Sequence, residues 1–156
     1  LMEKMEAHIK AELHRAFSIF IFNTKGEMLL QQRAFSKYHT PGLWTNTCCS
    51  HPRHEETLED ATARRLKEEM GMTCDIKEAF HFTYKADVSQ GLIEHEIDHV
   101  FIGVTDDTPI INTEEVASWK YDTMENVRQD IAANPQNYTA WFKIAFEEVL
   151  KHFNNK

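Results

Sequence analysis

The sequence predicts an α/β fold in a single domain, and three features lead to this prediction. Residues 15–23 form a near-continuous apolar run of strand length, typical of a strand buried on both faces. Residues 57–70 carry the start and stop signals of a helix, and residues 139–153 have a strong amphipathic period. A chain of 156 residues suits one domain with a real core, and it shows no repeat, low-complexity tract or linker.

Charge and composition restrict the classes of partner. The net charge of −8 argues against a nucleic-acid partner, because Lys and Arg dominate phosphate binding. No apolar run approaches the ~18 residues of a membrane span, and no secretory signal is visible, so we expect no membrane partner. The three cysteines do not resemble a disulfide framework. Free thiols indicate a reducing compartment, and we therefore expect a cytoplasmic protein.

The first apolar run continues into a predicted hairpin. Residues 23–26 (Asn-Thr-Lys-Gly) have turn composition, and residues 27–34 return as the second strand. Arg33 and Lys37 follow closely. Two cations this near to each other in a loop more often lie on the solvated surface. The alternative is that they form a site that binds phosphate oxygens.

Residues 44–52 form the predicted loop around which the chain is organised. Cys49 and His51 place a thiol and an imidazole two residues apart. Cys48 is interpreted as structural, because neighbouring side chains of an extended segment point in opposite directions. Cys49 also has a plain alternative, since free cysteine is commonly a small buried apolar residue.

The helix predicted at residues 57–70 has clear ends. Thr57 is a suitable N-cap, Asp60 lies near the positive helix end, and Gly71 suits the left-handed position after the last turn.

Charged pairs follow one another along this helix. Arg64 lies four residues before Glu68, and Arg65 four before Glu69, so each pair shares a helix face. Such charges usually form a salt-bridged exposed face. The alternative is a site for a metal-bound anionic substrate.

Two more strands are predicted at residues 73–85 and 92–104, with a turn at 87–91. Alternation places Glu94, Glu96 and Asp98 on one face of the second strand. Three like charges in a row repel one another, so this face requires either a cation or solvent.

The last part of the chain is predicted to hold a strand at residues 115–121, a helix at 123–133 and a helix at 139–153. The inward residues of the last helix are Trp141, Phe142, Ala145, Phe146, Val149 and Phe153. For Trp141, core packing is the plain interpretation.

Two motifs resemble a known family. The spacing of the Nudix box, G-x5-E-x7-R-E-U-x-E-E-x-G-U, is matched by Glu56, Arg64, Glu68, Glu69 and Gly71. Residues 45–52 resemble the signature of type 1 isopentenyl diphosphate isomerases. Ser50 replaces the first Gly of the box, and Arg65 replaces its first catalytic Glu. The second departure argues against Nudix hydrolysis and favours the isomerases.

The resemblance implies a Nudix-type α/β/α sandwich with a mixed β-sheet, formed by residues 1–156 as one domain that lacks an N-terminal part of the family's domain. It implies an isomerase of isoprenoid biosynthesis that interconverts isopentenyl diphosphate and dimethylallyl diphosphate through a tertiary carbocation. A hydrolase of nucleotide-type diphosphates is the alternative, and a non-catalytic binding module is a third. The implied partner is a small-molecule diphosphate, and the implied assembly a monomer or weak homodimer.

The resemblance also assigns residues. Cys49 and Glu96 are implied as two proton-transfer groups on opposite faces of the substrate. Tyr84 is implied to lie near Glu96. Which of Cys49 and Glu96 is the acid and which the base stays open. One Mn²⁺ or Zn²⁺ ion is implied, with the ligands His8, His14, His51, Glu94 and Glu96. A Mg²⁺ ion that arrives with the diphosphate is implied at Glu69. The implied substrate-binding residues are Lys4, Arg33, Lys37, Arg65 and Trp141.

Overall fold

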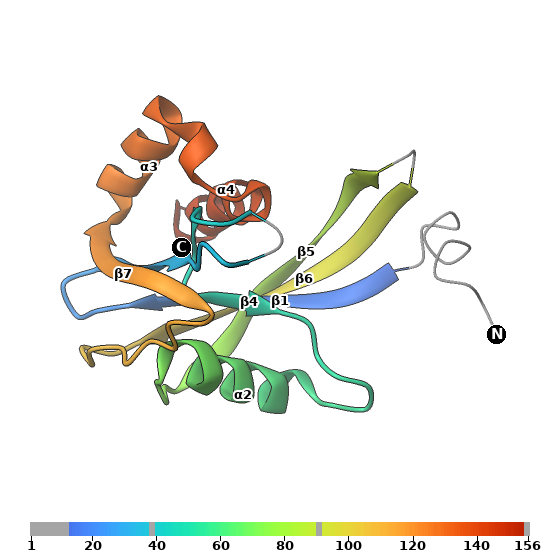
Figure 1. Ribbon diagram of the computed structural model, residues 1–156, viewed down its shortest axis with the longest axis horizontal. Helices are drawn as coiled ribbons and strands as arrows, with labels where there is room; N and C mark the ends of the chain where they lie inside the picture. The colour runs from blue at the N-terminus through green and yellow to red at the C-terminus, as the bar shows by residue number, and fades with distance from the viewer. Residues whose placement is uncertain (1–12, 38–39, 90–91, 155–156) are drawn as a thin grey trace.

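A mixed β-sheet lies between helix α2 on one face and helices α3 and α4 on the other (Figure 1). The computed structural model of the chain describes residues 13–37, 40–89 and 92–154, with side chains described at 15–37, 40–83 and 96–154. This architecture confirms the predicted α/β/α sandwich. Within the described part, no helix is both long and apolar enough to cross a membrane.

The sheet has the strand order β3-β2-β1-β6-β5, with β4 also paired to β1 and β7 to β2. Strands β1 and β6 run parallel, and the other pairs are antiparallel. The seven strands are Leu13–Phe22 (β1), Glu27–Arg33 (β2), Trp44–Thr45 (β3), Cys48–Ser50 (β4), Ile76–Ser89 (β5), Leu92–Val104 (β6) and Val116–Thr123 (β7). The predicted hairpin is confirmed, with Gly26 at a φ of 82° in its turn.

Strand β1 supplies both layers of the core, as its unbroken apolar run predicts. Alternate residues Phe17, Ile19 and Ile21 pack toward α2, and Phe20 and Phe22 pack toward α4. The sheet therefore separates two apolar layers, and any polar group in a layer has to find a partner there.

Helix α2 (Leu58–Met70) begins and ends as its sequence signals predict. The Thr57 hydroxyl accepts a hydrogen bond from the Asp60 amide at 3.1 Å. Gly71 has a φ of 61°, and a Cβ at this position would lie 2.2 Å from the Ile110 carbonyl oxygen. Only glycine fits this position, so the end of α2 is fixed by both backbone conformation and packing.

The C-terminal helices also follow the prediction. Helix α3 covers Met124–Ala133 with Thr123 as its N-cap, a short 3₁₀ turn η1 covers Pro135–Asn137, and helix α4 covers Ala140–Asn154. All six residues predicted to face inward from α4 belong to, or pack against, the apolar layer on that face.

Two segments predicted to be irregular contain regular structure, and the strand predicted from residue 73 begins only at Ile76. Residues 44–52 are not a simple loop, because β4 pairs with residues 17–19 of β1 and β3 pairs with β2. The turn predicted at 87–91 is shorter, since β5 continues to Ser89 beside β6. In both places backbone hydrogen bonds to a distant strand extend the regular structure beyond its local signals.

Removing the Phe142 side chain is expected to destabilise the protein by about 3–5 kcal/mol, the usual cost of a large buried aromatic. Phe142 is fully buried, and its ring centroid lies 6.1 Å from that of Phe20 and 5.7 Å from that of Phe146. Denaturant unfolding of Phe142→Ala measures the loss. Ile144→Ala, on the exposed side of the same helix, is the control. A loss no larger than that of the control would contradict this packing.

Candidate active site

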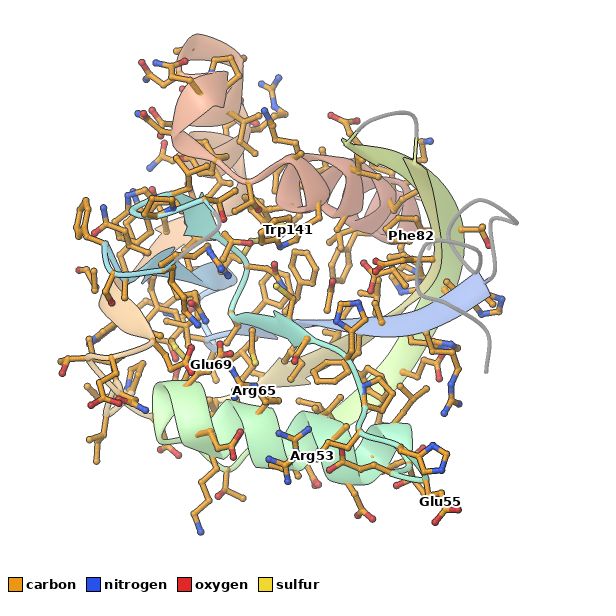
Figure 2. The ribbon with its side chains drawn as sticks, turned by 45° about the vertical axis from the view of Figure 1, so that its right-hand side comes forward. Arg53, Glu55, Arg65, Glu69, Phe82 and Trp141 are labelled. Carbon is orange, nitrogen blue, oxygen red and sulfur yellow. The ribbon has the colours of Figure 1, made fainter. Side chains whose placement is uncertain are left out.

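Cys49 lies on β4 with its side chain toward α4. It pairs with Ser18 of β1, and the Trp141 indole Nε1–H donates a hydrogen bond to its Sγ at 3.0 Å. The neighbouring Cys48 points the other way and is fully buried in the layer beneath α2, as expected of a structural residue. Figure 2 shows Trp141 reaching from α4 toward β4. The short strand β4 thus places one thiol in each layer.

Charge and burial keep Cys49 a neutral thiol. Burial raises its pKa to about 12, and the Glu69 carboxylate adds to this effect. Arg33 partly opposes it, and the Arg33 guanidinium lies 5.4 Å from the centroid of the Trp141 ring. Arg33, Trp141 and Cys49 therefore form one cluster that joins a cation, an aromatic face and a proton-bearing sulfur.

His51 and Glu96 meet on the same side of the sheet. His51 Nε2 lies 2.8 Å from Glu96 Oε1, although the two residues come from separate segments. The backbone of Glu96 is paired with that of His14 on β1 and with that of Tyr84 on β5. The solvent-exposed alternative for the acidic face of β6 is wrong here, because Glu96 is only 5% exposed.

Several predicted site residues fall outside the described part of the structure. Lys4 and His8 are outside it entirely. His14, Tyr84 and Glu94 have a described backbone, on β1, β5 and β6, but their side chains are not described.

The donor atoms present fit a divalent transition metal. A buried carboxylate oxygen and an imidazole nitrogen, 2.8 Å apart and drawn from different strands or loops, are the ligand types that Zn²⁺ and Mn²⁺ accept. A bound ion would add positive charge beside this deeply buried carboxylate.

Asp98 is a buried acid that the sequence placed on the correct face but did not assign to the site. It is 3% exposed, and the Ser18 hydroxyl donates a hydrogen bond to its Oδ2 at 2.8 Å. Its Oδ1 has no hydrogen-bond partner among the described residues. Burial, together with the nearby Glu96, raises the pKa of Asp98 to about 6 against the effect of the Ser18 bond. Asp98 in turn raises the pKa of Cys49, so it interacts electrostatically with both Cys49 and Glu96.

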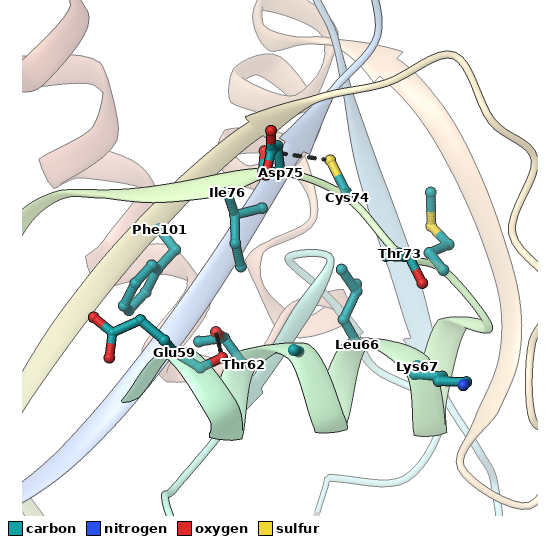
Figure 3. Close-up of a pocket in the computed structure, with 11 residues that line it drawn as sticks. Glu59, Thr62, Leu66, Lys67, Thr73, Cys74, Asp75, Ile76 and Phe101 are labelled. Atoms are coloured by element: carbon teal, nitrogen blue, oxygen red, sulfur yellow. Dashed lines mark hydrogen bonds between the residues drawn. The ribbon is translucent and has the colours of Figure 1, made fainter. Parts of the chain in front are cut away.

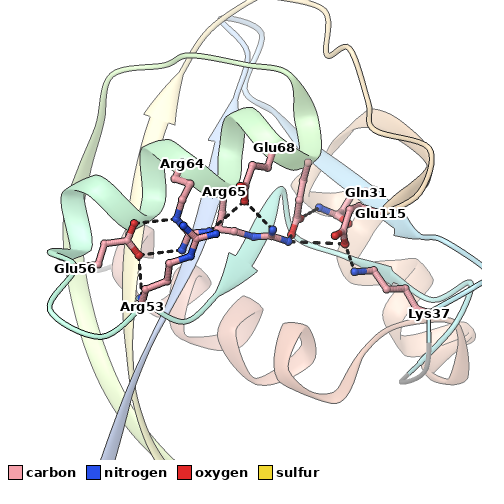
Figure 4. Close-up of polar contacts among 9 residues, drawn as sticks. Gln31, Lys37, Arg53, Glu56, Arg64, Arg65, Glu68 and Glu115 are labelled. Carbon is pink, nitrogen blue, oxygen red and sulfur yellow. Dashed lines mark hydrogen bonds and ion pairs between the residues drawn. The ribbon is translucent and has the colours of Figure 1, made fainter.

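A second polar cluster joins α2 to the loop after β2 (Figure 4). Arg65 donates to Glu68 at 2.8 Å and pairs closely with Glu69, and the Gln31 amide donates to Glu69 at 2.9 Å. Glu69 is buried, so the plain interpretation of an exposed helix face is wrong for this residue, whereas the Glu68 side chain is 40% exposed. Figure 2 shows Arg65 and Glu69 on the side of α2 toward the sheet.

Glu115 connects two of the predicted diphosphate ligands and carried no signal in the sequence. It pairs closely with Lys37, and its Oε2 lies 3.8 Å from the guanidinium of Arg65. Lys37 and Arg65 are both partly buried, with 25% and 19% of their side chains exposed. Glu115 holds the two cations close together in the described structure.

Glu56, at the start of the box, has a structural role. Its carboxylate accepts two hydrogen bonds from Arg64, at 2.8 and 2.9 Å, and one from the Arg53 amide at 2.8 Å. The bond from Arg64, followed by that from Arg53, lowers the pKa of Glu56 to about 2. These contacts fix the segment before α2 against the helix.

Glu56→Gln is expected to destabilise the protein at neutral pH, and the difference from wild type should vanish in acid. The pKa of Glu56 is lower when folded, so its contribution is present above about 4.5 and is lost as pH falls toward 2. Urea unfolding midpoints at neutral and acidic pH measure the difference. Glu55→Gln, at an exposed neighbour, is the control, and a pH-independent difference would contradict this role.

A hollow of about 290 Å³ lies on the other side of the sheet, between α2 and the start of β5 (Figure 3). Leu66, Met72, Cys74, Ile76 and Phe101 are among its lining residues. Phe101 packs in the layer beneath α2, whereas Cys49 faces α4. This hollow is therefore separate from the candidate active site.

Comparisons with known proteins identify the family of the chain. The NUDIX domain model matches residues 12–142. The chain is 50% identical over 149 residues to an isopentenyl-diphosphate Delta-isomerase of Pectobacterium atrosepticum, covering 96% of this chain and 83% of that one. It is 53% identical over 140 residues to isopentenyl-diphosphate Delta-isomerase 2 of Photorhabdus laumondii, covering 90% and 79%.

Solved structures show the same fold at low sequence identity. DR0079 from Deinococcus radiodurans superposes with a TM-score of 0.73 at 19% identity, covering 86% of this chain and 82% of that one. A MutT protein from Methanosarcina mazei gives a TM-score of 0.72 at 20% identity, covering 92% and 96%.

Proposed function

Since the chain belongs to the NUDIX domain family and, within it, to the isopentenyl-diphosphate Delta-isomerases, we propose how its residues carry out the isomerase reaction. The protein is an isomerase that interconverts isopentenyl and dimethylallyl diphosphate. The names of its relatives favour this activity over nucleotide diphosphate hydrolysis, in agreement with Arg65 at the position of a catalytic Glu.

The reaction adds one proton to the terminal carbon of the double bond and removes another from the carbon on the far side of the cationic centre. An alkene is a very weak base, so its protonation requires an acid placed directly against it and a pocket that excludes water from the tertiary cation. We assign the two proton transfers to Cys49 and Glu96, with Tyr84 beside Glu96. This pairing leaves either residue able to act as acid or base according to the direction of the reaction.

This assignment is supported by one observation: Cys49 and Glu96 lie on the same face of the sheet. Cys49 is held there by the Trp141 indole and Glu96 by His51. Asp98 interacts electrostatically with both Cys49 and Glu96. The Trp141 π face would stabilise a cation by ~2 kcal/mol or more once water is excluded.

The proposed transition-metal site consists of His51 and Glu96, together with His8, His14 and Glu94. A bound Mn²⁺ or Zn²⁺ ion would supply a fixed positive charge that orients the Glu96 carboxylate and tunes its acidity. The contact between His51 and Glu96 supports two of these five ligands. Glu69 is the proposed contact of a Mg²⁺ ion that enters with the diphosphate.

The diphosphate needs a locally basic site, because the net charge of the chain is −8. We assign this role to Arg33, Lys37 and Arg65, together with Lys4. Glu115 holds Lys37 and Arg65 near each other before substrate arrives, and phosphate oxygens would replace its carboxylate as their partner.

The compartment follows from the thiols. Cys48, Cys49 and Cys74 are free, and we infer that the protein works in the reducing environment of the cytoplasm.

The test is a deuterium-exchange experiment with the full chain. Incubation with isopentenyl diphosphate and a divalent metal in D₂O is expected to move deuterium into the substrate and to yield dimethylallyl diphosphate, both detected by NMR. A chelator should stop the exchange. Mg²⁺-dependent phosphate release from a nucleotide diphosphate without exchange would replace the proposal by a hydrolase, and neither activity in metal-loaded protein would leave a binding module.

A further inference from the structure

A second group of metal-ligating side chains lies on strands β5 and β6, away from the candidate active site. Glu78 and His81 belong to β5 and His99 to β6, and one ligand atom of each lies within 4.8 Å of the other two. Glu78 Oε2 lies 2.7 Å from His99 Nδ1 and 4.0 Å from His81 Nδ1. Two imidazoles and a carboxylate thus converge on one point.

A β-bulge produces this convergence. Residues three apart in a regular strand point to opposite faces of the sheet, so Glu78 and His81 would normally be separated. In β5, however, Glu78 pairs with Phe101, Phe80 with Val100 and His81 with His99, which leaves Ala79 as an extra residue. Bulges redirect side chains in this way, and here the bulge brings Glu78 to the face of His81 and His99.

The cluster and the active site occupy opposite faces of β6. His99 lies on the same face as Phe101, which packs beneath α2. Glu96 and Asp98 lie on the other face with Val100, which packs beneath α4. The backbone of the sheet therefore separates this cluster from the His51–Glu96 contact.

We propose that Glu78, His81 and His99 form a second site for a divalent transition metal of the Zn²⁺ class. Two nitrogens and one oxygen suit Zn²⁺, Co²⁺, Ni²⁺ or Cu²⁺, whereas Mg²⁺ and Ca²⁺ prefer oxygen ligands alone. Three protein ligands leave a fourth position for water. The exposure of the His81 and Glu78 side chains, 64% and 36%, provides access for that water.

The geometry requires only side-chain adjustment. Tetrahedral bonds of about 2.0–2.2 Å place ligand atoms ~3.3 Å apart. The Glu78–His99 separation has to lengthen slightly and the Glu78–His81 separation to shorten, from 2.7 and 4.0 Å. His81 and Glu78 are free to make these moves by rotation about their side-chain bonds, because the two strands hold their backbones in place.

His99 is the anchor of the site and also limits its affinity. Its side chain is 16% exposed, and its Nε2 is buried without a hydrogen-bond partner in the described part of the chain. Nδ1 is therefore the atom available to a metal, and the proton then resides on the unpaired Nε2. Burying an unpaired N–H is unfavourable, so we expect Zn²⁺ to bind in the micromolar range.

Metal stoichiometry tests the site in the full-length chain. Wild type, His81→Ala, Glu78→Gln and the control His54→Ala are stripped of metal, and bound zinc is measured by equilibrium dialysis against buffers of known free Zn²⁺ concentration. His54 is an exposed histidine outside the cluster. Wild type and His54→Ala should bind one equivalent more than His81→Ala, and Glu78→Gln should weaken this equivalent by ~10-fold or more.

Paramagnetic Cu²⁺ locates the ion. When the active-site metal is already bound, added Cu²⁺ should broaden the backbone NMR signals around residues 78–81 and 98–101 of wild type, and His81→Ala should remove this effect. Equal zinc stoichiometry in wild type and His81→Ala, or the same loss in His54→Ala, would overturn the proposal. The site does not depend on the isomerase mechanism, and His81→Ala is expected to exchange deuterium like wild type.

Discussion

Replacing Cys49 by alanine is expected to lower the rate of deuterium exchange into isopentenyl diphosphate by at least ~100- to 10,000-fold, the range that one positioned proton-transfer group contributes. The thiol is buried, neutral and held by the Trp141 indole, and alanine carries no exchangeable proton at this position. The measurement is exchange by NMR at saturating substrate and metal.

Cys74→Ala is the matched control, because it removes a thiol from the hollow beneath α2 and leaves the α4 face unchanged. Thermal unfolding of both variants shows whether the fold is intact. A folded Cys49→Ala protein that keeps a tenth or more of the wild-type rate would show that the sulfur is not one of the two proton-transfer groups.

The parts of the fold that the sequence predicted well are those set by local signals. Thr57 and Gly71 mark the ends of α2 because a cap and a left-handed glycine act within one helical turn. The apolar run of β1 identified a strand buried on both faces because its residues carry that pattern themselves.

Long-range pairing explains what local signals missed. The acidic face of β6 had two interpretations, because alternation gives the face of Glu96 and Asp98 but not what covers it. Burial by distant segments removed the solvent alternative. In the same way, Glu115 reaches Lys37 across 78 positions, and the bulge at Ala79 is visible only in the pairing of β5 with β6. A sequence motif can identify residues that are brought together by long-range pairing only when the family pattern already includes those residues.

Glu96→Gln is expected to remove both the exchange activity and one bound transition-metal ion. The amide cannot take up a proton as a carboxylate does, and the substitution removes the carboxylate that lies 2.8 Å from His51 Nε2. We expect a fall in exchange of at least ~100-fold, together with loss of the metal equivalent that supports it. Exchange and metal content are measured on the same samples.

Glu78→Gln is the matched control, because it makes the same chemical change on β5 at the opposite face of the sheet. It should weaken zinc binding at the second site while exchange continues at the wild-type rate. The two variants therefore distinguish the two metal sites. Loss of metal is accompanied by loss of exchange in Glu96→Gln but not in Glu78→Gln. If Glu96→Gln exchanges deuterium as fast as Glu78→Gln, the carboxylate at 96 takes no part in the proton transfer, and the assignment of this sheet face as the reaction centre fails with it.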